Sequence, residues 1–171
     1  MDIIIRQESE SDFRAVEDVV TLAFKGADHS DGNEASLVRA LRTSGSFIPE
    51  LSLVAVVEGM IVGYILLTKV GIGSGTGVAL APLAVLPSFQ RMGIGTVLVS
   101  RGHEEAKRMG FSVSVVLGSP DYYMRHGYKP ADAYCVYPPF DVASEYYMVC
   151  VLDRCRTVPR GVVRYDSAFG I

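Results

Sequence analysis

The residues of this chain with the clearest chemical potential are two glycines and an arginine at a predicted strand–turn–helix. Residues 83–86 are apolar and predict a strand, residues 87–88 predict a turn, and a long helical pattern follows Gly93 and Gly95. Glycines let an anion approach the backbone closely, and the first turn of a helix offers free N–H groups and the positive end of its dipole. Arg91 adds a side-chain cation. The combination is typical of a phosphate-binding loop; a plain helix cap whose glycines only allow close packing is the alternative.

The elements that position this loop follow from hydrophobic periodicity and from turn and cap signals. They predict the order β-α-α-β-β-β-α-β-α-β-β over residues 3–5, 10–24, 33–44, 51–57, 61–70, 78–86, 94–109, 112–117, 120–126, 128 onward and 147–152. The glycine-rich residues 71–77 are expected to form a flexible connection. A strand, a crossover helix and a strand at 78–117 predict a parallel right-handed unit. The fold class is therefore α/β, with a mixed, partly parallel sheet of about six to seven strands and about four flanking helices.

Length and composition indicate one globular domain over residues 1–171. The tail of residues 156–171 carries Val162, Tyr165 and Phe169, so we expect it to pack back on the domain. The net charge of −3 does not suggest a nucleic-acid-binding protein. The longest apolar run, residues 61–68, is far shorter than the roughly 20 residues of a membrane span. We expect a cytoplasmic protein without a membrane partner.

The three cysteines contain no C-x-x-C pair and predict free thiols in a reducing compartment. No group of His, Cys and carboxylate residues has the spacing of metal ligands, so no metal is expected. His103 is expected to be exposed on the outer part of the long helix, and His126, at the end of a short helix, is expected to be structural.

Several motifs resemble those of the GNAT superfamily, the acetyl-CoA-dependent N-acetyltransferases. Residues 90–95 read Gln-x-x-Gly-x-Gly and match its Q/R-x-x-G-x-G/A motif, and residues 123–128 read Tyr-x-x-x-Gly-Tyr and resemble its late Y-x-x-x-G-F/Y motif. The order of elements agrees as well. Residues 81–85 and 161–169 further resemble a YhbS-like bacterial subgroup. Many members have an asparagine where this chain has Val116, so one side-chain contact to the cofactor is absent or supplied otherwise.

The resemblance implies acetyl-CoA as co-substrate. The strand at residues 83–85 would splay from the strand at 112–117, and the cofactor would enter the gap, with its diphosphate on the backbone amides of residues 91–96. With this context, the phosphate-binding interpretation of the loop is favoured over the plain cap. The expected cofactor-binding residues are Leu83, Ala84, Val85, Gln90, Arg91, Met92, Gly93, Ile94, Gly95, Thr96 and Tyr123.

Two catalytic groups are expected from the same resemblance. A backbone N–H of Val85 would face the thioester oxygen and stabilise the tetrahedral intermediate. Tyr123 would be the general acid that protonates the departing thiolate, since a phenol with a pKa near 10 can supply that proton. A core aromatic role is the alternative for either member of the Tyr122–Tyr123 pair. The general base stays open among residues that border the acceptor cleft in the family: Asp28, His29, Glu34, Glu50 and Glu145.

The predicted function is transfer of the acetyl group to a primary amine of a small molecule or peptide by direct attack in a ternary complex. Residues 26–32, the second helix and residues 134–145 would form one side of the acceptor cleft, and their acidic and aromatic residues suit a cationic amine. A non-catalytic acyl-CoA-binding or sensor domain is the alternative, and an unrelated nucleotide-binding α/β domain is a weaker one. The sequence leaves a homodimer open.

Overall fold

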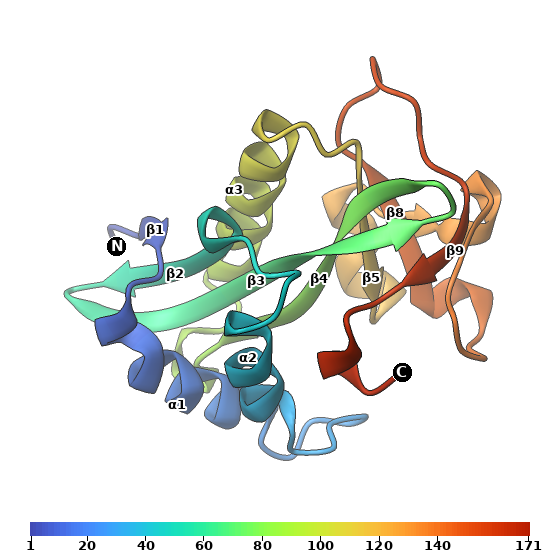
Figure 1. Ribbon diagram of the computed structural model, residues 1–171. Coiled ribbons are helices and arrows are strands. Elements are labelled where there is room, and N and C mark those ends of the chain that lie inside the picture. The colour runs from blue at the N-terminus through green and yellow to red at the C-terminus, as the bar shows by residue number, and fades with distance from the viewer.

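A long antiparallel hairpin forms the centre of the sheet. In the computed structural model, which describes residues 1–171, strand β3 (Met60–Ile72) pairs with strand β4 (Gly75–Val85). The sheet order is β1-β2-β3-β4-β5-β8-β6, and only the β4–β5 pairing along it is parallel (Figure 1). The other strands of this path are β1 (Ile4–Gln7), β2 (Ser52–Val57), β5 (Val113–Leu117), β6 (Lys129–Pro130) and β8 (Tyr147–Val151). The predicted mixed α/β sheet is confirmed.

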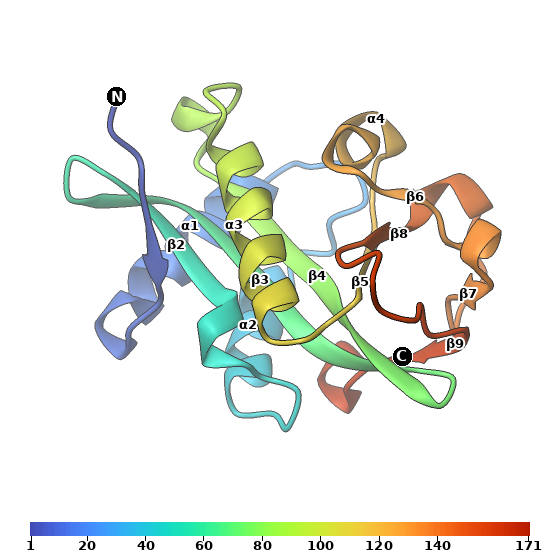
Figure 2. The same cartoon turned by 90° about the horizontal axis from the view of Figure 1, so that it is seen from above.

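Helices cover both faces of this sheet. Figure 1 shows α1 (Phe13–Phe24) and α2 (Glu34–Arg42) below it and α3 (Ile94–Arg108) above it. Seen from above in Figure 2, α3 crosses β2, β3 and β4, and the short α4 (Pro120–Tyr123) lies beyond β5. Alternate residues of β3 face the two layers, as the period of a strand requires. Tyr64 and Leu66 pack with α1 and α2, whereas Ile65 and Leu67 pack with α3.

Residues 71–77 do not form the expected flexible connection, and that expectation was wrong. Gly71 pairs with Thr76 and Ile72 with Gly75, which leaves only residues 73–74 as the turn. These glycines allow Arg164 to approach the hairpin backbone closely. The Arg164 side chain occupies the place of a β-carbon on Gly71, and it donates a hydrogen bond of 2.8 Å to the Gly73 carbonyl. A segment far along the chain, not flexibility, explains this glycine spacing.

That segment is β9 (Gly161–Arg164), which pairs antiparallel with β3 and parallel with the two-residue β7 (Val136–Tyr137). Beyond it, the Tyr165 and Tyr147 hydroxyl oxygens lie 2.8 Å apart. Phe169 packs against the apolar core that α1 and α2 form with the sheet. The C-terminus therefore ends beside α2 (Figure 1). None of the helices combines the length and apolar character that crossing a membrane requires.

Candidate active site

The two parallel strands separate before they end. β4 and β5 pair only at Val78–Ser114 and Ala79–Val115. Beyond that point β4 continues to Val85 and β5 to Leu117 without further pairing. An extra residue in β4 between Leu80 and Leu83 shifts the register with β3, which bends the strand locally. An opening at the carboxyl ends of parallel strands is a common position for ligand sites in α/β proteins.

The backbone of Val85 is directed into this opening. Leu86 donates its N–H to the Val62 carbonyl at 2.9 Å, so Leu86 and Val62 form a hydrogen-bonded pair. Because such pairs alternate along an antiparallel ladder, the neighbouring Val85–Gly63 pair turns its N–H and C=O groups away from each other. The Val85 carbonyl accepts instead from Gln90 Nε2 at 3.0 Å. The Val85 N–H therefore faces the unpaired gap on the β5 side.

A cavity of about 720 Å³, here called the main cavity, lies where β4, the start of α3 and α4 meet. It is lined by Leu83, Val85, Phe89, Gln90, Arg91, Gly93, Ile94, Gly95, Thr96, Ser119, Tyr122, Tyr123 and Arg125. Of the expected site residues, Ala84 and Met92 do not line it. The Ala84 side chain is buried on the α1 face, and Met92 is exposed. The structure adds Phe89, Ser119, Tyr122 and Arg125, which the motif alone did not single out.

The loop of residues 90–96 presents backbone amides to the main cavity. Arg91 and Gly93 both have left-handed backbone angles, with φ of 64° and 84°, and Gly93 caps α3. The first helical bond runs from Val97 N–H to the Gly93 carbonyl at 3.1 Å. The amides that precede Val97 at the start of the helix therefore have no partner within α3. Their free N–H groups and the helix dipole favour an anion at this place.

Tyr122 and Tyr123 have different surroundings although they are adjacent. Tyr123 packs edge-on against Tyr128, with ring centroids 5.6 Å apart, and its ring fills the place of a β-carbon on Gly118. Its burial raises the pKa of the phenol well above the usual value, so the hydroxyl is protonated at neutral pH. The Tyr122 ring is half-buried, and its hydroxyl lies against Gly95. Burial raises the pKa of Tyr122 as well.

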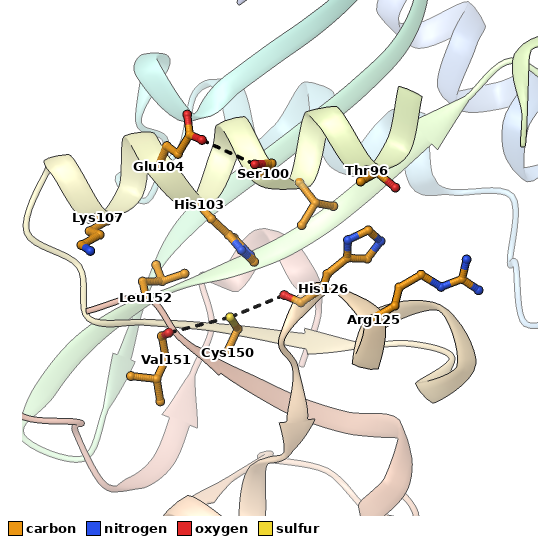
Figure 3. A pocket seen from close by; sticks show the side chains of 11 residues that line it. Thr96, Ser100, His103, Glu104, Lys107, Arg125, His126, Cys150, Val151 and Leu152 are labelled. Carbon is orange, nitrogen blue, oxygen red and sulfur yellow. Dashed lines mark hydrogen bonds between the residues drawn. The ribbon is translucent and has the colours of Figure 1, made fainter. Parts of the chain in front are cut away.

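A second hollow of about 470 Å³, the side cavity, lies between α3 and β8 and shares Thr96 and Arg125 with the main cavity (Figure 3). His103 points into it from α3, so the expectation that His103 is exposed was wrong. Its Nε2 lies 2.9 Å from the Tyr128 hydroxyl oxygen, which lies 2.7 Å from Ser114 Oγ. Burial, with a smaller effect of His126, lowers the pKa of His103 to about 4. The expectation failed because η4 (Met124–His126) and β8 cover this flank of α3.

The candidate bases are not gathered at the main cavity. None of Asp28, His29, Glu34, Glu50 and Glu145 lines it. Glu34 accepts a hydrogen bond of 2.6 Å from Ser30 and lines a separate hollow between the ends of α1 and α2. No three His, Cys, Asp or Glu side chains are placed to hold a metal ion. Val116 is buried among core residues between α3 and the sheet, so its side chain offers no polar contact.

This chain is an α/β protein whose two parallel strands separate beside the free amides at the start of a helix. Comparison with known proteins then gives the family: the model described as "Acetyltransferase (GNAT) family" matches residues 15–128. The chain belongs to this family and is an acyltransferase by class. The resemblance inferred from residues 90–95 and 123–128 is thus confirmed.

Relatives in sequence and structure agree with this assignment. The chain is 38% identical to "Uncharacterized N-acetyltransferase YjhQ" of Escherichia coli K12, over 80% of this chain and 76% of that protein. It is 30% identical to "Uncharacterized N-acetyltransferase YhbS" of the same organism, over 98% of both. A GNAT family acetyltransferase from Brucella melitensis, solved in complex with acetyl-CoA, superposes with a TM-score of 0.81 at 30% identity, covering 98% of both chains. YhbS from Escherichia coli, solved with CoA, gives 0.85 at 25% identity, covering 99% of this chain and 92% of that one.

Proposed function

We propose that this chain is an N-acetyltransferase that moves the acetyl group of acetyl-CoA to a primary amine of a small molecule or peptide, by direct attack within a ternary complex. The observation that carries the proposal is the unpaired gap between β4 and β5, which opens directly onto the free amides at the start of α3. The Brucella melitensis and YhbS structures, which hold acetyl-CoA and CoA, support the choice of cofactor.

In this proposal, the diphosphate of acetyl-CoA binds the backbone amides of residues 91–96, with Arg91 adding positive charge. The pantetheine arm follows the gap along Leu83, Ala84 and Val85 through backbone contacts, which do not need the Ala84 side chain to face the cavity. Gln90 holds the loop in place through its bond to the Val85 carbonyl. Met92 is exposed beside the loop, so it contributes its backbone and not its side chain.

The chemistry needs one bond to form and one to break. The neutral amine attacks the thioester carbonyl carbon, a C–N bond forms, and negative charge develops on the carbonyl oxygen. The Val85 N–H, directed into the gap, stabilises that charge; one such donor contributes about 3–4 kcal/mol in well-studied enzymes. The C–S bond then breaks, the amine nitrogen loses a proton, and the thiolate gains one. We assign the donation to Tyr123, whose phenol is protonated at neutral pH.

The acceptor in this proposal is a primary amine that carries a positive charge in solution. Residues 26–32, α2 and residues 134–145 carry acidic and aromatic side chains that suit a cationic amine, but none of the candidate bases lines the main cavity. The proposal therefore assigns no base. It places the reaction in the cytoplasm.

The test is a thiol-release assay with acetyl-CoA and a panel of primary amines, run beside calorimetric titration with CoA. Binding of CoA together with amine-dependent release of thiol supports the proposal. Binding of CoA without transfer to any amine would instead identify an acyl-CoA-binding or sensor domain. Preference for ATP or NAD over CoA would contradict the cofactor assignment.

A further inference from the structure

Tyr122 is held in a fixed position at the wall of the main cavity. It lies in the first turn of α4, where its N–H donates to the Ser119 carbonyl at 3.2 Å. Its ring packs edge-on against Tyr123, with centroids 5.0 Å apart, and tilted against His126 at 4.9 Å. The Arg125 guanidinium carbon lies 5.5 Å from the ring centroid on its face. Figure 3 shows Arg125 and His126 at the side cavity, near Thr96 at the start of α3.

This packing places the Tyr122 hydroxyl at the start of α3. The oxygen lies in the volume that a β-carbon on Gly95 would occupy, and the ring carbon that bears it lies 3.6 Å from that position. The hydroxyl makes no hydrogen bond to another side chain or to a carbonyl of the protein. The nearby groups of the helix start are N–H donors, which cannot accept the hydroxyl proton.

A phosphate oxygen would satisfy both kinds of donor at once. An anion seated on the free amides of α3 lies next to the Tyr122 oxygen, and a hydroxyl donates well to a charged acceptor. We propose that Tyr122 binds the cofactor directly, with its hydroxyl donating a hydrogen bond to the diphosphate held at the start of α3. This inference rests on the proposed use of acetyl-CoA. It gives the adjacent tyrosines separate tasks: Tyr122 binds the diphosphate and Tyr123 serves the sulfur end.

The alternative is that the Tyr122 hydroxyl only packs against Gly95 and has to move before the diphosphate can bind. The two cases predict opposite changes in the CoA affinity of Tyr122→Phe. A ligand contact makes Tyr122→Phe weaken CoA binding, because the diphosphate loses a donor. A displaced hydroxyl makes the same change neutral or favourable, because less has to move.

The experiment compares CoA with pantetheine, which lacks the diphosphate and the nucleotide. CoA affinity is measured by calorimetry, and pantetheine affinity by an NMR titration that reaches millimolar concentrations. Tyr122→Phe keeps the ring and its packing, and the matched control is Tyr146→Phe, at an exposed tyrosine that does not line the main cavity. We expect Tyr122→Phe to weaken CoA binding about tenfold or more, as for a hydrogen bond to a charged group. Pantetheine binding should not change, and Tyr146→Phe should bind CoA as the unmodified chain does.

Each other result has a defined meaning. If Tyr122→Phe binds CoA as well as or better than the unmodified chain, the inference is wrong while the proposed function stands. If CoA and pantetheine lose affinity equally, Tyr122 acts through packing, and the inference is again wrong. If the unmodified chain does not bind CoA, the proposed function fails and this inference fails with it. Thermal unfolding of each variant shows whether the fold is retained.

Discussion

The hydroxyl oxygen of Tyr122 lies in the volume that a β-carbon on Gly95 would occupy, so these two residues share one space at the start of α3. Gly93 is different: a β-carbon there would meet nothing within 4 Å, but its φ of 84° favours glycine. The two glycines of the motif therefore have separate physical reasons. Gly95 provides room, and Gly93 provides the backbone conformation that starts the helix.

We predict that Gly95→Ala weakens CoA binding with little effect on stability. The added methyl group displaces only the end of the Tyr122 side chain, and alanine in a helix is favoured over glycine by about 0.5–1 kcal/mol. The displaced phenol and the methyl group then occupy the place of the anion. Calorimetry with CoA and thermal unfolding measure the two effects. Gly93→Ala is the control, since an alanine at this φ should lower stability by about 1–2 kcal/mol. CoA affinity unchanged in Gly95→Ala would contradict the assignment of the loop.

For the proton donor, we predict that Tyr123→Phe lowers kcat and kcat/KM together. General acid catalysis contributes about 10²–10⁴-fold, and a smaller loss is expected here because a thiolate is a fair leaving group that water can also protonate. The raised pKa of Tyr123 means that its own ionisation should not limit the rate in neutral solution. Steady-state kinetics with the identified amine measure the effect. In the paired control, Tyr122→Phe should raise KM for acetyl-CoA and change kcat less; the reverse pattern would exchange the two roles.

Stability should depend strongly on Arg42. Its guanidinium is buried between two carboxylates: Nη2 lies 2.5 Å from Glu8 and Nη1 lies 2.9 Å from Glu17. Glu8 is also buried and accepts a hydrogen bond of 2.6 Å from Ser52. Arg42→Met leaves the buried Glu8 carboxylate without its charged partner, which typically costs about 3–5 kcal/mol. Urea unfolding measures the loss.

Arg39→Met is the control for this change, because Arg39 binds the same Glu17 from an exposed position. An exposed ion pair contributes about 0–1 kcal/mol, so this variant should unfold nearly as the unmodified chain does. Equal losses of unfolding free energy in the two variants would show that burial does not increase the contribution of the Arg42 ion pairs to stability.

The features that could be predicted best from the sequence are those that depend on the spacing of neighbouring residues. Gly93 and Gly95 lie within one turn, so the strand–turn–helix and the free amides at its helix start could be inferred without knowing what packs around them. The alternating Val113 and Val115 predicted a strand in the same way. Spacing to Gly127 selected Tyr123 from the tyrosine pair, but it carried no information on where the neighbouring hydroxyl points. That direction is set by Gly95, a residue of a different element.

The failed expectations depend on contacts from distant parts of the chain. Gly71 and Gly73 indicated a loop because the sequence does not show that Arg160 and Arg164 approach them. His103 follows the buried Gly102 on α3, and helical periodicity alone places it beside the apolar stripe, facing solvent. Its flank is covered only because the chain returns through η4 and β8. Such coverage is a tertiary property that a hydrophobic pattern does not encode.

The last prediction concerns the pH dependence that follows from the position of His103. Burial lowers its pKa to about 4 in the folded chain, against an ordinary value of 6.5. The unfolded chain therefore binds the proton first as pH falls, and stability rises with pH between these two values. Folding stability is therefore unaffected by His103 above pH 6.5 and falls as pH falls toward 4, by an amount on the order of 3 kcal/mol. His126, whose pKa is also lowered by burial, acts in the same direction.

His103→Gln separates the contribution of His103 from that of His126. Glutamine keeps a polar group near the Tyr128 hydroxyl but binds no proton, so the free energy of unfolding should depend less steeply on pH in this range. Urea unfolding of both chains at a series of pH values gives the two slopes. NMR titration of the ring protons reads the pKa of His103 directly. A midpoint near 6.5, or identical slopes in the two chains, would show that His103 is solvated and that the side cavity does not hold its ring in the neutral form.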